Sequence, residues 1–93
     1  MEYFVIAERE LILGFKLAGV NGEVAVNRAE ALAAFNRVTG RGGAEAVPAD
    51  ERPKILILTE DVSAMIEDEV LDWQKTSQYP LIVEIPGIHG HLE

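Results

Sequence analysis

The sequence has no cysteine, a single tryptophan and few basic residues. Without cysteine there are no disulfides, no thiolate catalysis and no cysteine-based zinc sites. Only 8 Lys and Arg residues stand against 16 Asp and Glu residues, which gives a formal net charge of -8. A field of this sign repels nucleic-acid phosphates and anionic lipids, so a basic protein is the more plausible partner. Such charge also keeps a small domain soluble, and the sequence leaves both roles open.

Long hydrophobic runs are also missing. No apolar run approaches the roughly 20 residues of a membrane span, and the N-terminus has neither the basic start nor the long apolar core of a signal peptide. We therefore expect a cytoplasmic protein without direct membrane insertion. The 93 residues are 48% hydrophobic and 26% charged, which favours one folded domain over a disordered chain. We place this domain at residues 1–86.

The segment Ile55 to Leu58 consists of four consecutive branched apolar residues. Such a run leaves no polar face for water, so it predicts a central parallel strand that is covered on both sides. The polar residues 59–61 follow, and apolar residues then recur at helical spacing as far as Trp73. We therefore expect this strand to run directly into one helix.

Three further apolar segments are typical of strands, and two helical segments lie between them. The expected strands are residues 3–7, 23–26 and 81–85; the expected helices follow residues 8–10 and Asn27, and they end near Gly19 and Gly40. Alternation of strands and helices predicts an α/β domain with a parallel sheet and helices on both faces. We expect four strands in the order 2-1-3-4, as in part of a flavodoxin-like sheet.

Acidic residues gather where the expected strands end. In an open parallel sheet, ligands bind beyond the carboxyl ends of the strands, at the point where the strand order reverses. The residues expected there are Glu8, Glu10, Thr59, Glu60 and Asp61. They could hold magnesium, or Asp61 could accept a phosphoryl group as in receiver domains. Two residues separate the apolar run from Asp61, however, and carboxylates at a helix start also stabilise it by about 0.3 to 1 kcal/mol each.

No catalytic motif is recognisable in the sequence. A nucleophilic serine elbow, a dinucleotide fingerprint and a phosphate loop are all missing, because the glycines near Arg41 follow a helix and not a strand. His89 and His91 have no third metal ligand nearby in the sequence. We expect no enzymatic activity, no cofactor and no metal, and we interpret residues 87–93 as a flexible tail.

Four segments carry a resemblance to a known family: residues 8–10, Gly-Phe-Lys-Leu-Ala-Gly-Val at 14–20, residues 57–60, and Pro-Leu-Ile-Val-Glu-Ile-Pro-Gly at 80–87. In order and spacing the chain resembles the F subunit of V-type (archaeal and bacterial A/V-type) ATP synthases over nearly its whole length. The resemblance implies a flavodoxin-like, non-catalytic rotor part that binds the coiled coil of the D subunit in the central stalk. Such a part helps to couple ATP hydrolysis or synthesis to ion transport, and it is peripheral to the membrane through the complex.

The chain departs from this family in two places. Members usually continue past the Pro-Gly segment into a C-terminal helix, which we expect to be absent here, and the loop from Gly40 to Pro53 is longer than usual. An alternative hypothesis is a receiver-like signalling domain with an acidic metal or phosphate rim. We expect Gly14 to let its helix approach the sheet or a partner closely, because glycine is otherwise costly inside a helix. The candidate partner-binding residues are Gly14, Phe15, Glu60, Asp61, Gly87 and Ile88.

Overall fold

Four parallel strands form the centre of the protein. A computed structural model describes residues 2–41, 46–76 and 79–87. The elements in chain order are β1 (Tyr3–Ala7), α1 (Arg9–Leu17), β2 (Asn21–Val24), α2 (Arg28–Thr39), the 3-10 helix η2 (Ala49–Glu51), β3 (Ile55–Thr59), α3 (Glu60–Met65), α4 (Glu67–Thr76) and β4 (Leu81–Ile85). The strand order is β2-β1-β3-β4 and every pairing is parallel. The predicted fold class and strand order are confirmed.

The ends of α2 follow the signals in the sequence. The Asn27 side chain accepts a hydrogen bond from the Glu30 backbone N–H at 2.9 Å, and the Glu30 carboxylate accepts one from the Val26 N–H at 3.0 Å. The first bond satisfies a donor that the first helical turn leaves unpaired, and the second pairs the N–H of the residue before the cap. At the other end, Gly40 adopts a left-handed conformation with φ of 89°. Glycine is suited to this conformation because it has no Cβ to clash.

The single helix that we predicted after β3 is wrong in one respect, because two helices occupy this segment. The backbone leaves the helical conformation at Ile66, with φ of -126° and ψ of 39°. The Ile66 side chain is fully buried in the core. The break therefore coincides with a large apolar side chain in the core, and spacing alone did not reveal it.

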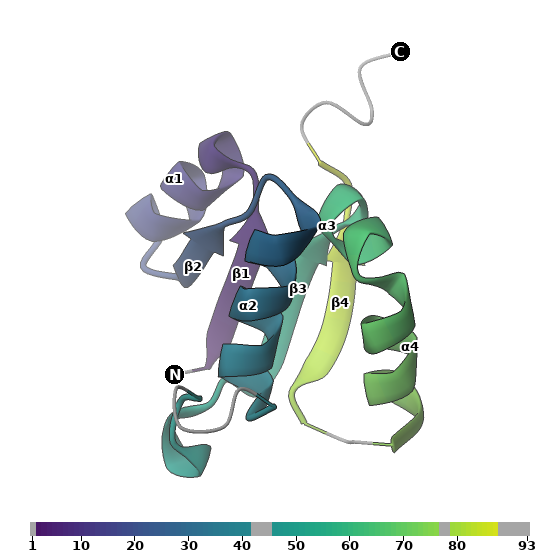
Figure 1. Ribbon diagram of the computed structural model, residues 1–93. Helices are drawn as coiled ribbons and strands as arrows, with labels where there is room; N and C mark the ends of the chain where they lie inside the picture. The colour runs from purple at the N-terminus through teal and green to yellow at the C-terminus, as the bar shows by residue number, and fades with distance from the viewer. Residues whose placement is uncertain (1, 42–45, 77–78, 88–93) are drawn as a thin grey trace.

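Helices lie on both faces of the sheet, but unevenly. Figure 1 views the sheet from the face covered by α2, α3 and α4, and α1 lies on the far side. Under α2, α3 and α4 lies the main core, whose largest fully buried members include Phe35, Ile6, Leu56 and Leu58. A smaller cluster under α1 contains Val5, Ala7 and Ile12. None of the helices in the described ranges is long and apolar enough to cross a membrane.

Strand β3 is not covered on both sides, which corrects the prediction from its apolar run. Leu56 and Leu58 point into the main core and are fully buried, whereas Ile57, between them, is only half-buried on the α1 side. Successive side chains of a strand point to opposite faces. Helices therefore cover one face of the sheet fully and the other face only partly.

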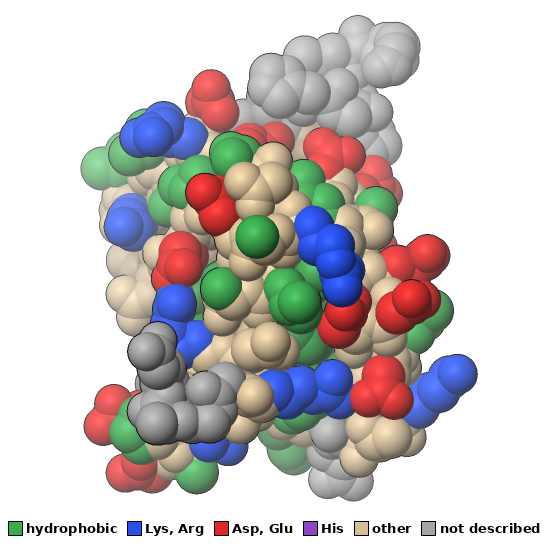
Figure 2. All heavy atoms as spheres, viewed as in Figure 1, with side chains coloured by type: hydrophobic (Ala, Val, Ile, Leu, Met, Phe, Trp, Pro, Cys, Tyr) green, Lys and Arg blue, Asp and Glu red, His purple; other side chains and the backbone are tan. Residues whose placement is uncertain are grey.

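Ion pairs lie on the surface of the face that α2, α3 and α4 cover. Arg28 of α2 pairs with Glu69 of α4, and Arg41 pairs with Asp72 of α4 at 2.7 Å. The hydrogen bond between Arg28 and Glu69 lowers the pKa of the Glu69 carboxyl and raises that of the guanidinium. Figure 2 shows this face, where basic and acidic side chains lie next to each other over α2 and α4. Interspersed opposite charges of this kind are typical of a solvated surface.

Strand β2 begins two residues earlier than the sequence suggested, so Gly22 lies within it. It pairs with Val5, and a Cβ placed on Gly22 would lie 2.8 Å from the Val5 carbonyl oxygen and 2.9 Å from Ile12 Cδ1. Only glycine fits between β1 and α1 at this position. We expect Gly22→Ala to lower the free energy of unfolding by about 1 to 3 kcal/mol, as overpacking does in well-packed cores. Urea denaturation measures this, and an unchanged midpoint would contradict the close packing of α1 on β2.

Candidate functional site

The predicted partner-binding residues fall into two groups. Gly14 and Phe15 lie in the middle of α1, on the less covered side of the sheet. Glu60 and Asp61 form the first turn of α3, and Gly87 follows the last strand, so these three lie at the carboxyl edge of the sheet. Ile88 lies outside the described residues, as does the predicted tail apart from Gly87. Partner binding by these residues stays a prediction.

At the carboxyl edge, carboxylates meet around Gly87. This glycine is buried, and a Cβ on it would lie 3.1 Å from Glu8 Oε2 and 3.5 Å from Asp61 Oδ2. Thr59 ends β3 and caps α3, because its hydroxyl accepts a hydrogen bond from the Val62 N–H at 3.2 Å. Negative charge at the start of α3 is favourable for the helix. The carboxyl edge is therefore acidic. Part of its negative charge lies at the start of α3, where it stabilises the helix.

This edge offers little to the receiver hypothesis. Thr59, not an aspartate, occupies the end of β3, and Asp61 lies inside the first turn of α3. Within the described part of the chain, no group of three acidic or histidine side chains is placed to hold a metal ion. His89 and His91 lie outside that part. Phosphoryl transfer would need a cation to offset the charge of the phosphate and the acceptor.

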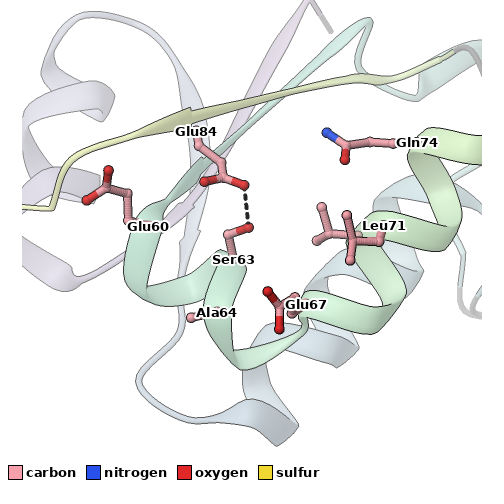
Figure 3. Close-up of a pocket in the computed structure, with 8 residues that line it drawn as sticks. Glu60, Ser63, Ala64, Glu67, Leu71, Gln74 and Glu84 are labelled. Atoms are coloured by element: carbon pink, nitrogen blue, oxygen red, sulfur yellow. Dashed lines mark hydrogen bonds between the residues drawn. The ribbon is translucent and has the colours of Figure 1, made fainter.

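A second acidic feature is a pocket between α3, α4 and β4. Figure 3 shows Glu60, Glu67 and Glu84 around it, with Leu71 and Gln74 on the α4 side. The Ser63 hydroxyl donates a hydrogen bond to Glu84 Oε2 at 2.7 Å. Three carboxylates around one pocket repel a phosphate or another anion. The pocket is thus unsuited to binding a nucleotide through its phosphates.

The flank of α1 that carries Gly14 and Phe15 is apolar and partly exposed. A Cβ on Gly14 would meet no atom within 4 Å, so Gly14 does not mediate a close approach to the sheet, which corrects half of our expectation for it. Gly14 lines a shallow apolar depression together with Leu11, Phe15, Ala18 and the acidic Glu10. Close approach of Gly14 to a partner stays a prediction. Nearby, Leu17 is 91% exposed.

Beside α1, the sheet surface over β3 and β4 has no helix covering it among the described residues. We call this surface the open face; it consists of Tyr3, Ile55, Ile57, Leu81, Val83 and Ile85. The pairing places Tyr3, Ile55 and Leu81 side by side in one row, and Val5, Ile57 and Val83 in the next. Tyr3, Leu81 and Val83 are 44%, 54% and 43% exposed. Large contiguous exposed apolar patches often mark interaction sites.

Our sequence reasoning missed the open face, although a signal for it was present. Right-handed connections place their helix on opposite faces according to the direction in which the chain moves across the sheet. In the order 2-1-3-4 only the first connection moves one way, so α1 alone lies on its face. The strand order thus already implied that the half of this face over β3 and β4 would lack a helix.

A substitution at Gly14 tests whether the surface of α1 around this residue is open in the isolated protein. We expect Gly14→Ala to raise the free energy of unfolding by about 0.5 to 1 kcal/mol, because alanine favours the helix and the position is open. Thermal denaturation of the isolated protein checks the gain. A loss of stability would show that α1 packs there against something that the described residues do not include.

Comparisons with known proteins agree with the resemblance in the sequence. The model of the family described as "ATP synthase (F/14-kDa) subunit" matches residues 4–93. The F subunit of the A-type ATP synthase of Methanocaldococcus jannaschii is 33% identical over 94 residues, an alignment that covers 100% of this chain and 82% of that protein. Both matches extend over the sheet, α1 and the carboxyl edge. The chain therefore belongs to the family of ATP synthase (F/14-kDa) subunits.

Proposed function

We propose that the protein is a non-catalytic rotor component of an A/V-type ATP synthase, and that it binds the coiled coil of the D subunit in the central stalk. In this role it helps to couple ATP hydrolysis or synthesis to ion transport. It works in the cytoplasm and is held near the membrane only through the complex. The observation that supports binding best is the open face beside the apolar flank of α1.

The contrast between the two faces of the sheet supports an interaction role. The α2 and α4 surface carries ion pairs between its helices, whereas the open face presents apolar side chains from three neighbouring strands. Burying apolar surface is favourable by about 25 cal/mol per Å². A partner that covers this face therefore gains binding energy from surface that the isolated domain leaves in water.

The acidic features favour a binding role over catalysis. The pocket lined by Glu60, Glu67 and Glu84 disfavours phosphates, and the carboxyl edge adds Glu8 and Asp61. Rotary ATP synthases carry their nucleotide chemistry on other subunits, as the resemblance implies. A protein whose task is to hold a coiled coil needs apolar surface and complementary charge, and it needs no reacting group.

Co-expression with the D subunit of the same ATP synthase tests the proposal. We expect the two chains to elute together from a size-exclusion column as a stable complex. In a parallel sample, acetyl phosphate and magnesium should add no phosphate mass to the protein. Separate elution of the two chains would contradict the rotor proposal, and phosphorylation at Asp61 would instead support the receiver-like alternative.

A further inference from the structure

We propose that the open face is the surface that meets the coiled coil, and that it takes a single partner helix over β3 and β4. This inference rests on the proposed function and adds to it the face, the size of the contact and the charge of the partner helix. The alternatives on the same molecule are the exposed Leu13 and Leu17 on α1 and the acidic pocket beside α4. Three features of the open face favour it.

The width of the open face matches one helix. Neighbouring strands lie about 4.8 Å apart, so the two strands that α1 leaves uncovered offer a strip roughly 10 Å wide, which is about the diameter of an α-helix with its side chains. On this side α1 packs on β1 and β2 through Val5, Val24 and Ile12. A helix over β3 and β4 would lie beside α1 and complete the layer.

The strip has an apolar floor and an apolar wall. Two rows of side chains, one ending at Leu81 and one at Val83, cross the sheet in register. Leu11 and Phe15 of α1 belong to the same apolar cluster as Ile57, so the flank of α1 continues directly into the floor. A helix with an apolar stripe can therefore contact floor and wall together, as an amphipathic helix does in a groove.

The two ends of the strip differ in charge. At its amino end Glu2 and Lys54 form an ion pair with 3.9 Å between Nζ and Oε2. At its carboxyl end, the Glu8 and Asp61 carboxylates lie around Gly87, and Asp61 has no ion pair with any residue that the structure describes. We infer that the partner helix carries Lys or Arg beside its apolar stripe, at the end that lies over the carboxyl edge.

Matched leucine substitutions test the assignment in the complex with the D subunit. Leu81 on the open face and Leu71 on α4 are 54% and 47% exposed, and they lie on opposite sides of the sheet. We expect Leu81→Asp to weaken binding at least tenfold by calorimetric titration, and Leu71→Asp to change it less than twofold. Asp61→Asn should weaken binding several-fold at low salt and little at high salt, because screening removes the attraction.

Thiol labelling gives a second measurement, which can still be interpreted if a substitution changes the affinity for the partner. The chain has no cysteine, so Leu81→Cys and Leu71→Cys each introduce one thiol whose alkylation is followed by the intact mass of this chain. We expect the bound coiled coil to slow alkylation at position 81 at least tenfold and at position 71 less than twofold. Both single-cysteine variants must first show the circular dichroism spectrum of the parent.

The outcomes separate the inference from the proposed function. If the parent protein does not bind the coiled coil of the D subunit, the proposed function itself fails. If the parent binds but position 81 is neither protected nor sensitive, the partner meets another surface and the inference is overturned while the rotor role stands. Protection at position 71 would place the partner on the α4 side instead.

Discussion

Phe35→Ala is expected to lower the free energy of unfolding by about 3 to 5 kcal/mol. Phe35 is fully buried in α2 and packs on Trp73 in a T-shaped arrangement, with 6.3 Å between ring centroids and an interplanar angle of 82°. Trp73 also donates a hydrogen bond from Nε1 to the Pro80 carbonyl at 3.0 Å, which ties α4 to the start of β4. Removing the Phe35 ring thus leaves a cavity at the contact between α2 and α4.

The single tryptophan makes this loss directly measurable. Urea denaturation followed by Trp73 fluorescence gives the free energy of unfolding, and the native emission should shift to longer wavelength as the indole loses its apolar neighbour. Phe15→Ala is the matched control, because Phe15 is only half-buried on α1. We expect it to cost less than about 2 kcal/mol. A loss below about 1.5 kcal/mol for Phe35→Ala would show that the α2–α4 contact is loosely packed.

Local chemistry in the sequence predicted much of the fold. The sequence predicted the Asn27 cap, the Gly40 turn and the apolar runs of β1, β3 and β4, because each depends on residues close together in the chain. The parallel sheet followed from the alternation of strands and helices, and the strand order was expected by analogy with a flavodoxin-like sheet. The sequence did not predict the break between α3 and α4 at Ile66, because the break coincides with core packing between residues far apart in the sequence.

The candidate site was predictable only in part. The residues at the carboxyl edge were found because parallel strands end together, and the structure brings Asp61 and Gly87 close to Glu8 as a result. The open face was missed because an apolar run shows that a strand lacks a polar side, not that both sides are covered. For Leu81 and Val83 the covering layer is absent from the described part of the chain, so an apolar strand remains partly in water.

The asymmetry of the sheet predicts opposite outcomes for the same substitution on its two faces. Leu56 is fully buried in the main core, and Leu81, in the next strand, is 54% exposed on the open face. In Leu56→Asp, loss of the buried leucine side chain lowers the free energy of unfolding by about 2 to 5 kcal/mol. The new carboxylate has no partner in the core, so burying it costs further free energy or forces its protonation. Since small domains hold only about 5 to 15 kcal/mol of stability, we expect this variant to be largely unfolded at about 25 °C.

Leu81→Asp places the same carboxylate in water, so we expect it to change the free energy of unfolding by no more than about 1 kcal/mol, the span of strand preferences. Far-UV circular dichroism and urea denaturation of the isolated protein distinguish the two variants. If both unfold, the open face belongs to the core and is not available to a partner. If Leu56→Asp remains folded, α2 and α4 do not exclude water from the sheet. Only the expected pair of results leaves a folded domain with one apolar face exposed for a helix to cover.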